Sequence, residues 1–119
     1  MQKISHEDVM LPVVVAAEQI RGRSDAISKA EPSRLAQLQE LFRITLALLD
    51  EFPILYFGEK ALAVAEQLKS QKKTRKRHAD VLIAAQVIAG NHILVTRNIK
   101  DFRDLVPARQ LQNWVDDDI

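Results

Sequence analysis

Three carboxylates, Glu18, Asp80 and Asp101, are the residues of this chain with the clearest potential for chemistry. Carboxylates that lie close together repel one another and raise one another's pKa unless a cation neutralises them. Their hard oxygen atoms select Mg²⁺ or Mn²⁺, and such an ion can activate water and stabilise charge on a phosphoryl oxygen. If the three side chains converge, the sequence therefore predicts a Mg²⁺ or Mn²⁺ site.

The elements that would position these acids are short apolar strands alternating with helices. Strands are predicted at Met10–Val15, Phe52–Phe57 and His92–Thr96, and helices opening at Glu18 and covering Ser33–Glu51, Glu59–Gln71 and Ala79–Ala89. This alternation indicates an α/β fold with a parallel sheet covered on both faces. Strand C-termini and the N-termini of the following helices then share one edge, where ligands bind. Glu18 and Asp101 follow strands and Asp80 opens a helix, so all three should face that edge.

Local features refine this prediction. Gly22 is expected to end or bend the first helix, and Gly90-Asn91 should cap the apolar helix before it in a left-handed conformation. That helix is apolar nearly all round, so it should be buried on more than one side. Leu105–Val106 is predicted as a short last strand, and Trp114 as an anchor for the tail.

Each acid also has a simpler interpretation. Asp80 could cap its helix or complement the helix dipole, and Asp101 could cap the short turn that follows it. Glu18 could form a surface ion pair with Arg21 or Arg23. From spacing alone the metal site and these structural roles remain open alternatives.

Thr96, Arg97 and Asn98 directly follow the third predicted strand. Such residues are common in turns, which is the simpler interpretation. Their position on the same edge as the acids also suits contacts to a substrate or a metal ion.

Composition limits the class of protein. At 119 residues with 47% hydrophobic residues, the chain is expected to form one domain with a single core. It has no Cys, so any metal must be held by oxygen or His, and a reducing cytoplasm is the expected location. The apolar run near the N-terminus is too short for a membrane span and lacks the features of a signal peptide.

A basic run, Lys69–Arg77, holds six of the seventeen Lys and Arg residues and no acid. A solvated loop is the simpler interpretation. Because the run borders Asp80, it could instead hold RNA phosphates, giving affinity but no choice of sequence. The candidate RNA-binding residues are Arg97 and five residues of this run: Lys72, Lys73, Arg75, Lys76 and Arg77.

Three segments resemble PIN domains: VAAEQIRGR at Val15–Arg23, HADVLIAAQVIAG at His78–Gly90 and ILVTRNIKDF at Ile93–Phe102. The resemblance is greatest to the VapC-type toxins of VapBC toxin–antitoxin modules, in the form common in cyanobacteria, and the ending PARQLQNW at Pro107–Trp114 is similar too. Overall it covers essentially residues 7–115. It implies a single PIN-like domain over residues 1–119, with a three-layer α/β/α (Rossmann-like) parallel sheet.

The resemblance also implies a function. PIN domains are Mg²⁺- or Mn²⁺-dependent ribonucleases with four acids in the site. Glu18 matches the second of these acids, Asp80 the third and Asp101 the fourth, while Thr96 and Asn98 match polar supporting positions. The implied partners are an RNA substrate, a VapB-type antitoxin and a second copy in a homodimer.

The sequence departs from the family pattern at its front. The family begins with a strand that ends in Asp, and nothing before His6 matches that strand. We therefore expect a domain that is incomplete at its N-terminus, lacks the first acidic ligand and the central strand carrying it, and is an impaired nuclease. The alternatives are a degenerate PIN module that binds an antitoxin or RNA without cleaving, and a phosphoacceptor domain. The last fits only the coarse pattern, because its acidic pair and later Lys are missing.

Overall fold

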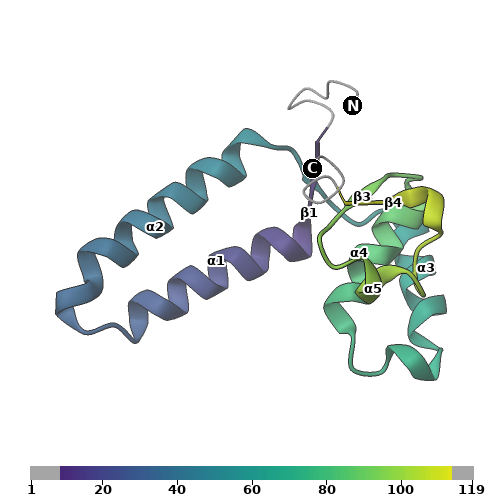
Figure 1. Ribbon diagram of the computed structural model, residues 1–119, viewed down its shortest axis with the longest axis horizontal. Helices are drawn as coiled ribbons and strands as arrows, with labels where there is room; N and C mark the ends of the chain where they lie inside the picture. Colours follow the sequence, from purple (N-terminus) through teal and green to yellow (C-terminus); the bar gives the residue numbers. More distant parts are fainter. Residues whose placement is uncertain (1–8, 114–119) are drawn as a thin grey trace. The chain divides into compact units, whose positions relative to one another are not determined.

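A computed structural model describes residues 9–113 of the chain. The chain divides into two compact units, unit 1 at Met1–Tyr56 and unit 2 at Phe57–Ile119 (Figure 1). The two units are described separately below. The assignment of residues 1–119 to one PIN-like domain stays a prediction.

Unit 1 is a pair of helices that follows one short strand and precedes another. Its elements are β1 (Leu11–Pro12), α1 (Val13–Ser28), α2 (Pro32–Glu51) and β2 (Ile54–Leu55). The helices run antiparallel as a hairpin (Figure 1), and β1 pairs in parallel with β2, with Leu11 opposite Ile54. Between the helices, the Nε of Arg23 donates a hydrogen bond of 3.1 Å to the hydroxyl of Thr45.

The predicted strands of unit 1 are longer than the observed ones. The prediction of a strand through Val15 is wrong beyond Pro12, because Val13 already begins α1. A short apolar run has no periodicity that separates a strand from a helix, and Pro12 at the N-cap loses no helical hydrogen bond. The helix also continues through Gly22 to Ser28. The prediction for α2 is confirmed, with Pro32 in its first turn.

Unit 2 holds the remaining elements. They are α3 (Glu59–Lys69), the 3₁₀ helix η2 (Lys72–Thr74), α4 (His78–Ala89), β3 (Leu94–Val95), α5 (Ile99–Phe102), the 3₁₀ helix η3 (Ala108–Gln110) and β4 (Leu111–Gln112). β3 pairs in parallel with β4, with Leu94 opposite Leu111 and Val95 opposite Gln112. The short parallel strands between helices confirm the α/β class.

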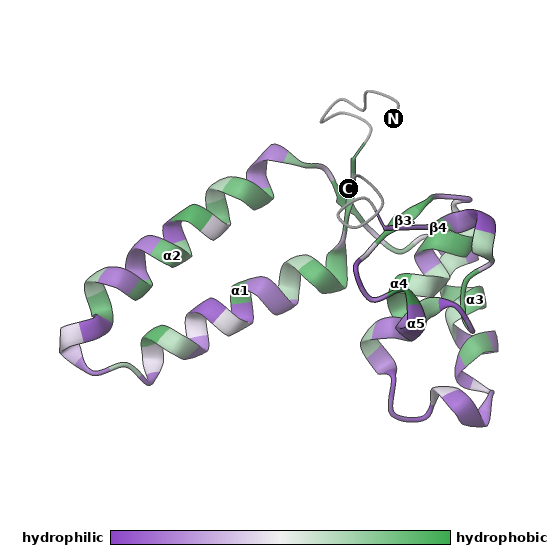
Figure 2. Ribbon diagram, in the orientation of Figure 1, coloured by the Kyte–Doolittle hydropathy of each residue, from purple (hydrophilic) through white to green (hydrophobic). Residues whose placement is uncertain are grey.

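The core of unit 2 forms around α4, which Figure 2 shows as largely apolar. Val81, Ala84 and Ala85 are fully buried, so the prediction that this helix is covered on more than one side is confirmed. A buried apolar cluster is made by residues of α4, α5 and the segment after α5: Ala84, Val87, Phe102, Leu105 and Val106. The end of α5 is therefore held against α4 by buried apolar contacts.

Gln110 connects three parts of unit 2. Its side chain is 3% exposed, and its Nε2 donates hydrogen bonds to the carbonyl oxygens of Val87 at 3.0 Å and His92 at 2.9 Å. One amide thus satisfies a carbonyl near the end of α4 and another just before β3, where unpaired acceptors would be costly.

The turn after α4 differs in detail from the prediction. Asn91 has the left-handed conformation, with φ of 52°, whereas Gly90 has φ of −93°. A Cβ at position 90 would lie 2.2 Å from the Nε2 of His92, so a side chain there would require the His92 ring to move. The predicted strand at Leu105–Val106 is wrong: both amides bond to the carbonyl of Phe102 in a turn, and the last described strand is β4. Trp114 lies outside the described residues.

Candidate functional site

Two of the three predicted metal ligands belong to unit 2. Asp80 lies in the first turn of α4, and Asp101 lies in the short helix α5. Glu18 belongs to unit 1, in the second turn of α1, and so does not open a helix as predicted. That Glu18 joins the other two acids stays a prediction.

Arg77 is the residue that connects Asp80 with the α5 segment. Its Nη1 and Nη2 donate hydrogen bonds of 2.7 and 2.9 Å to the two carboxylate oxygens of Asp104, and Nη2 also bonds the carbonyl oxygen of Asp101. Its Nε lies 3.9 Å from Oδ2 of Asp80. The carboxylates of Asp80 and Asp101 are therefore both within electrostatic range of one guanidinium.

The Arg77–Asp104 pair changes the acid–base properties of both groups. The hydrogen bonds that Arg77 donates to Asp104 raise the pKa of the Arg77 guanidinium and lower the pKa of the Asp104 carboxyl. Burial opposes both shifts, but the side chains are 25% and 42% exposed, so its effect is the smaller one. Both partners are accordingly charged at neutral pH.

The structure supports some of the simpler interpretations of Asp80, Asp101 and Glu18 but not others. The N-cap position of α4 is occupied by Arg77, so Asp80 is not the cap residue, although its place in the first turn complements the helix dipole. Asn98 holds the N-cap position of α5, and Asp101 lies within the helix. Within residues 9–113, no ion pair joins Glu18 to a neighbouring arginine.

The polar residues after β3 form a turn. The hydroxyl of Thr96 accepts a hydrogen bond of 3.0 Å from the amide of Asn98, which supports the turn interpretation for this residue. The amide of Thr96 donates to the carbonyl of Gln112 at 3.0 Å, so the turn starts from the β3–β4 pairing. A contact of Thr96 or Asn98 with a metal or a substrate stays a prediction.

The donors present in unit 2 suit a hard cation. Asp80 and Asp101 offer carboxylate oxygens that are accessible to water, and Mg²⁺ commonly binds through one or two carboxylates while it keeps several waters. Asp104 is not available in the same way, because Arg77 occupies both its oxygens. In the part of the chain that the structure describes, no group of three or more His, Cys, Asp or Glu is arranged to hold a metal ion.

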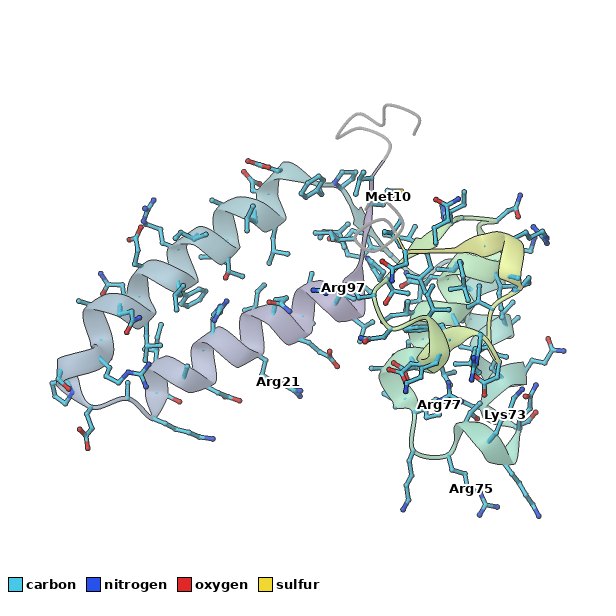
Figure 3. The ribbon with its side chains drawn as sticks, in the orientation of Figure 1. Met10, Arg21, Lys73, Arg75, Arg77 and Arg97 are labelled. Carbon is cyan, nitrogen blue, oxygen red and sulfur yellow. The ribbon has the colours of Figure 1, made fainter. Side chains whose placement is uncertain are left out.

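The basic run is partly structural. Thr74 is buried, and its hydroxyl bonds the carbonyls of Leu68 and Gln71 at 2.8 Å. The Nζ of Lys73 donates a hydrogen bond of 2.9 Å to the carbonyl of Asp104. Besides Lys73, the exposed candidate RNA-binding residues are Lys72, Arg75, Lys76 and Arg97, and Figure 3 shows Arg75 extending away from unit 2.

Sequence reasoning missed two contributors to this region. Asp104 was not singled out, although it is an acid one helical turn after Asp101. Lys73 was assigned only to RNA, whereas it also bonds the backbone at Asp104. A pairing between positions 27 residues apart, as in Arg77 and Asp104, leaves no local pattern in a single sequence.

Comparisons with known proteins agree with the resemblance seen in the sequence. The family model of the PIN domain matches residues 1–106. A chain in the solved structure of VapBC-1 from nontypeable Haemophilus influenzae is similar in fold, with a TM-score of 0.69 and 22% identity. The similarity covers 96% of this chain and 80% of that one. A search of curated proteins gave no match.

One further finding concerns membranes. Among the helices of residues 9–113, none combines the length and the apolar character needed to cross a bilayer.

Proposed function

The chain belongs to the PIN-domain family, and from this premise we propose that it is a divalent-metal-dependent endoribonuclease of the VapC toxin type. The observation that carries the proposal is that the carboxylate of Asp80 and the backbone carbonyl of Asp101 both contact Arg77, on two helices that share a core. PIN domains are generally metal-dependent nucleases. Two accessible acids brought together in such a domain are what a metal site requires.

Within this proposal, Glu18, Asp80 and Asp101 hold Mg²⁺ or Mn²⁺, and Thr96 and Asn98 support the site. When bound, such an ion activates water and stabilises charge on a phosphoryl oxygen. The support from this chain is the hard-oxygen chemistry of the acids and their exposure to water. Action in the cytoplasm is part of the same proposal, because toxins of this type act on cellular RNA.

RNA binding is assigned to the exposed cations of the basic run and to Arg97. Lys72, Arg75 and Lys76 lie in the chain just before the helix that carries Asp80. Lysine and arginine bind phosphates without choosing a sequence, and such binding weakens as salt increases. Arg77 is removed from the RNA-binding set in this proposal, because its guanidinium is already bonded to Asp104.

A VapB-type antitoxin is proposed as the protein partner, and a homodimer as the assembly. Five large apolar side chains of α1 and α2 are exposed: Ile20, Leu35, Ile44, Leu46 and Leu48. Exposed apolar residues in such number on one helix pair are typical of a surface that another chain covers.

We also propose that cleavage by residues 1–119 is weak, because the family site has four acids and only three are matched here. For the same reason we propose that the family's first central strand is not among the strands described here. The three-layer sheet that this strand would complete stays part of the proposal. Support comes from the sheets themselves. Within residues 9–113, the sheet of each unit has two parallel strands, and parallel strands usually occur in larger sheets covered on both faces.

The test is cleavage of a labelled RNA by residues 1–119 with Mn²⁺, with EDTA as the metal-free reference. Asp80→Asn and Asp101→Asn should each lower the cleavage rate by at least about tenfold, the loss expected when a metal site is damaged. Glu59→Gln is the matched control, since Glu59 also lies in the first turn of a helix of unit 2. Equal activity of all four proteins, or activity that survives EDTA, would contradict the proposal.

A version extended by a strand that ends in Asp tests the impairment separately. It should cleave faster than residues 1–119, and equal rates would show that the three acids suffice.

A second candidate function is a degenerate PIN module that binds RNA or an antitoxin without cleaving. It is favoured by the lack of a three-ligand group in residues 9–113. In that case RNA would be retained in a filter-binding assay, EDTA would not change the binding, and no cleavage would appear with either version of the chain.

A further inference from the structure

The short helix α5 carries Asp101 but is too short to hold its own position. It has four residues, Ile99–Phe102, and a single helical turn is marginally stable by itself. The buried side chain of Phe102 holds the end of α5 against α4. Apolar contacts are not directional, however, so they leave the rotation of this turn weakly defined. Directional hydrogen bonds are needed to define it.

The carbonyl oxygens of α5 show where such bonds come from. Those of Ile99 and Phe102 accept hydrogen bonds from amides that follow in the chain. The carbonyl oxygen of Asp101 accepts a hydrogen bond from Nη2 of Arg77, a residue of a different segment. A cation at the last carbonyls of a helix also complements the helix dipole. Arg77 thus holds the α5 turn at the residue that is a predicted metal ligand.

Asp104 fixes the direction in which Arg77 donates this bond. Its two carboxylate oxygens accept hydrogen bonds from both terminal nitrogens of Arg77, at 2.7 and 2.9 Å. Two such bonds define the plane of a guanidinium, which one bond does not. Lys73 in turn donates a hydrogen bond of 2.9 Å to the carbonyl of Asp104, so the loop that carries this carboxylate is itself held. The pair therefore directs Nη2 towards the Asp101 carbonyl.

We propose that Arg77 is a positioning residue for Asp101, because it bonds the backbone of Asp101 and so sets the orientation of the α5 turn relative to the first turn of α4. The inference rests on the proposed function, in which Asp101 is a metal ligand. Arg77 is also the residue before α4 and forms an ion pair with Asp80 at 3.9 Å. It therefore contacts both segments of unit 2 that carry predicted ligands.

The first test needs no metal. Amide hydrogen exchange is followed by NMR at Arg103, whose amide bonds the carbonyl of Ile99 and closes the turn around Asp101. Arg77→Lys keeps the charge but loses the two-point geometry, so exchange at Arg103 should become about fivefold faster, as expected for the net loss of one hydrogen bond. The amide of Ala85, in the buried part of α4, should not change, which separates local loosening from unfolding. Wild-type exchange at Arg103 would overturn the inference.

The second test measures Mn²⁺ binding by calorimetry, without RNA. Arg77→Gln removes a positive charge beside Asp80, so an effect of charge alone would make Mn²⁺ bind more tightly. A positioning role predicts the opposite. Binding should weaken about tenfold in Arg77→Gln and in Arg77→Lys, the loss expected when a residue that orients a metal ligand is changed. Tighter binding by Arg77→Gln, or wild-type affinity of Arg77→Lys, would overturn the inference.

Lys100→Gln is the matched control for charge. Lys100 is an exposed residue of α5 next to Asp101, and its replacement removes one positive charge from the same turn. Exchange at Arg103 should stay at the wild-type rate, and Mn²⁺ binding should not weaken. Losses as large as those of Arg77→Gln would show that the turn responds to any change of charge, contrary to the inference.

Asp104→Asn tests whether Asp104 acts through Arg77. It should speed exchange at Arg103 as Arg77→Lys does, and the double variant should be no faster, since either change breaks the same two-point bond. Additive effects would mean that the two residues act independently, which the inference excludes. If the wild type bound no Mn²⁺ at all, the proposed function would fail, while amide exchange would still decide whether Arg77 holds the turn.

Discussion

The two units bury their apolar side chains to very different extents. Among the described residues of unit 1, only Ala16 and Thr45 are buried, whereas Leu46 and Leu48 are about half exposed. Unit 2 buries residues from three parts of its chain, α4, α5 and the segment after α5, in one cluster. Both units contain well-formed helices, so the formation of a helix does not by itself produce a buried core.

The difference shows where stability should reside. Apolar burial is the main favourable contribution to folding, and segments with few buried contacts open at low free energy. We therefore expect unit 2 to keep Asp80 and Asp101 in place by itself. The helix pair α1–α2 should depend on a partner or on further chain to cover its leucines.

The largest expected effect compares a core residue of unit 2 with an exposed residue of unit 1. Phe102→Ala removes a side chain that is 6% exposed and should cost about 3–5 kcal/mol of unfolding free energy. Leu48→Ala, at 52% exposure, should cost no more than about 0.5 kcal/mol. Urea unfolding followed by circular dichroism measures both, and similar losses would show that the helix pair has a core of its own.

A smaller effect is expected for Gln110, whose amide bonds two backbone carbonyls. Gln110→Met keeps the volume but removes this donor. The carbonyl of Val87 keeps its hydrogen bond from the amide of His92, so the cost of about 1–3 kcal/mol comes mainly from the carbonyl of His92. Gln67, which is exposed on α3, provides the control, and Gln67→Met should be neutral. Amide hydrogen exchange at the end of α4 should become faster in Gln110→Met but not in Gln67→Met.

Thr45 is the corresponding buried polar residue of unit 1. Its hydroxyl donates to the carbonyl of Leu41 at 2.9 Å and accepts from Arg23. Thr45→Val keeps the shape and removes both bonds, for a loss of about 1 kcal/mol. Because Arg23 can turn to water at this partly exposed position, the loss should be smaller than that of Gln110→Met. An equal or larger loss would weaken the contrast between the units.

The sequence predicted the long helices well because their periodicity extends over several turns. The helices predicted at Ser33–Glu51 and Ala79–Ala89 both appear within one residue of the expected start. Short apolar segments were less predictable: Val13–Val15 is helical, and Leu105–Val106 is buried but not a strand. A short buried segment is apolar whether it forms a strand, a helix or a turn, so its residues alone do not distinguish these structures.

For the candidate site, position in the fold was more predictable than side-chain partners. That Glu18, Asp80 and Asp101 converge stays a prediction, although the Asp80 carboxylate and the Asp101 carbonyl have Arg77 as a common neighbour. The bonding of Arg77 to Asp104 was not foreseen, since it depends on how α4 and α5 pack. A charged residue in a basic run was therefore assigned to RNA when its neighbours in space are acids.

The smallest expected effect concerns pH and compares an ion pair from each unit. The hydrogen bonds from Arg77 lower the pKa of Asp104 below its usual 3.8, so the pair stabilises the fold above that pH. The unfolded chain takes up the proton first, and this stabilisation is lost as the pH falls from about 4 through the lower pKa of the folded state. The contribution is at most about 1 kcal/mol, because the Asp104 side chain is 42% exposed.

Thermal unfolding between pH 7 and pH 3 measures this effect. Asp104→Asn should flatten the fall in Tm below pH 4, since it removes the titrating group. The pKa of Glu40 is likewise lowered by the hydrogen bonds that it accepts from Arg43, but these side chains are 53% and 70% exposed on α2. Glu40→Gln should therefore leave the pH profile close to that of the wild type. A larger change for Glu40→Gln than for Asp104→Asn would mean that the helix pair, and not unit 2, limits stability in acid.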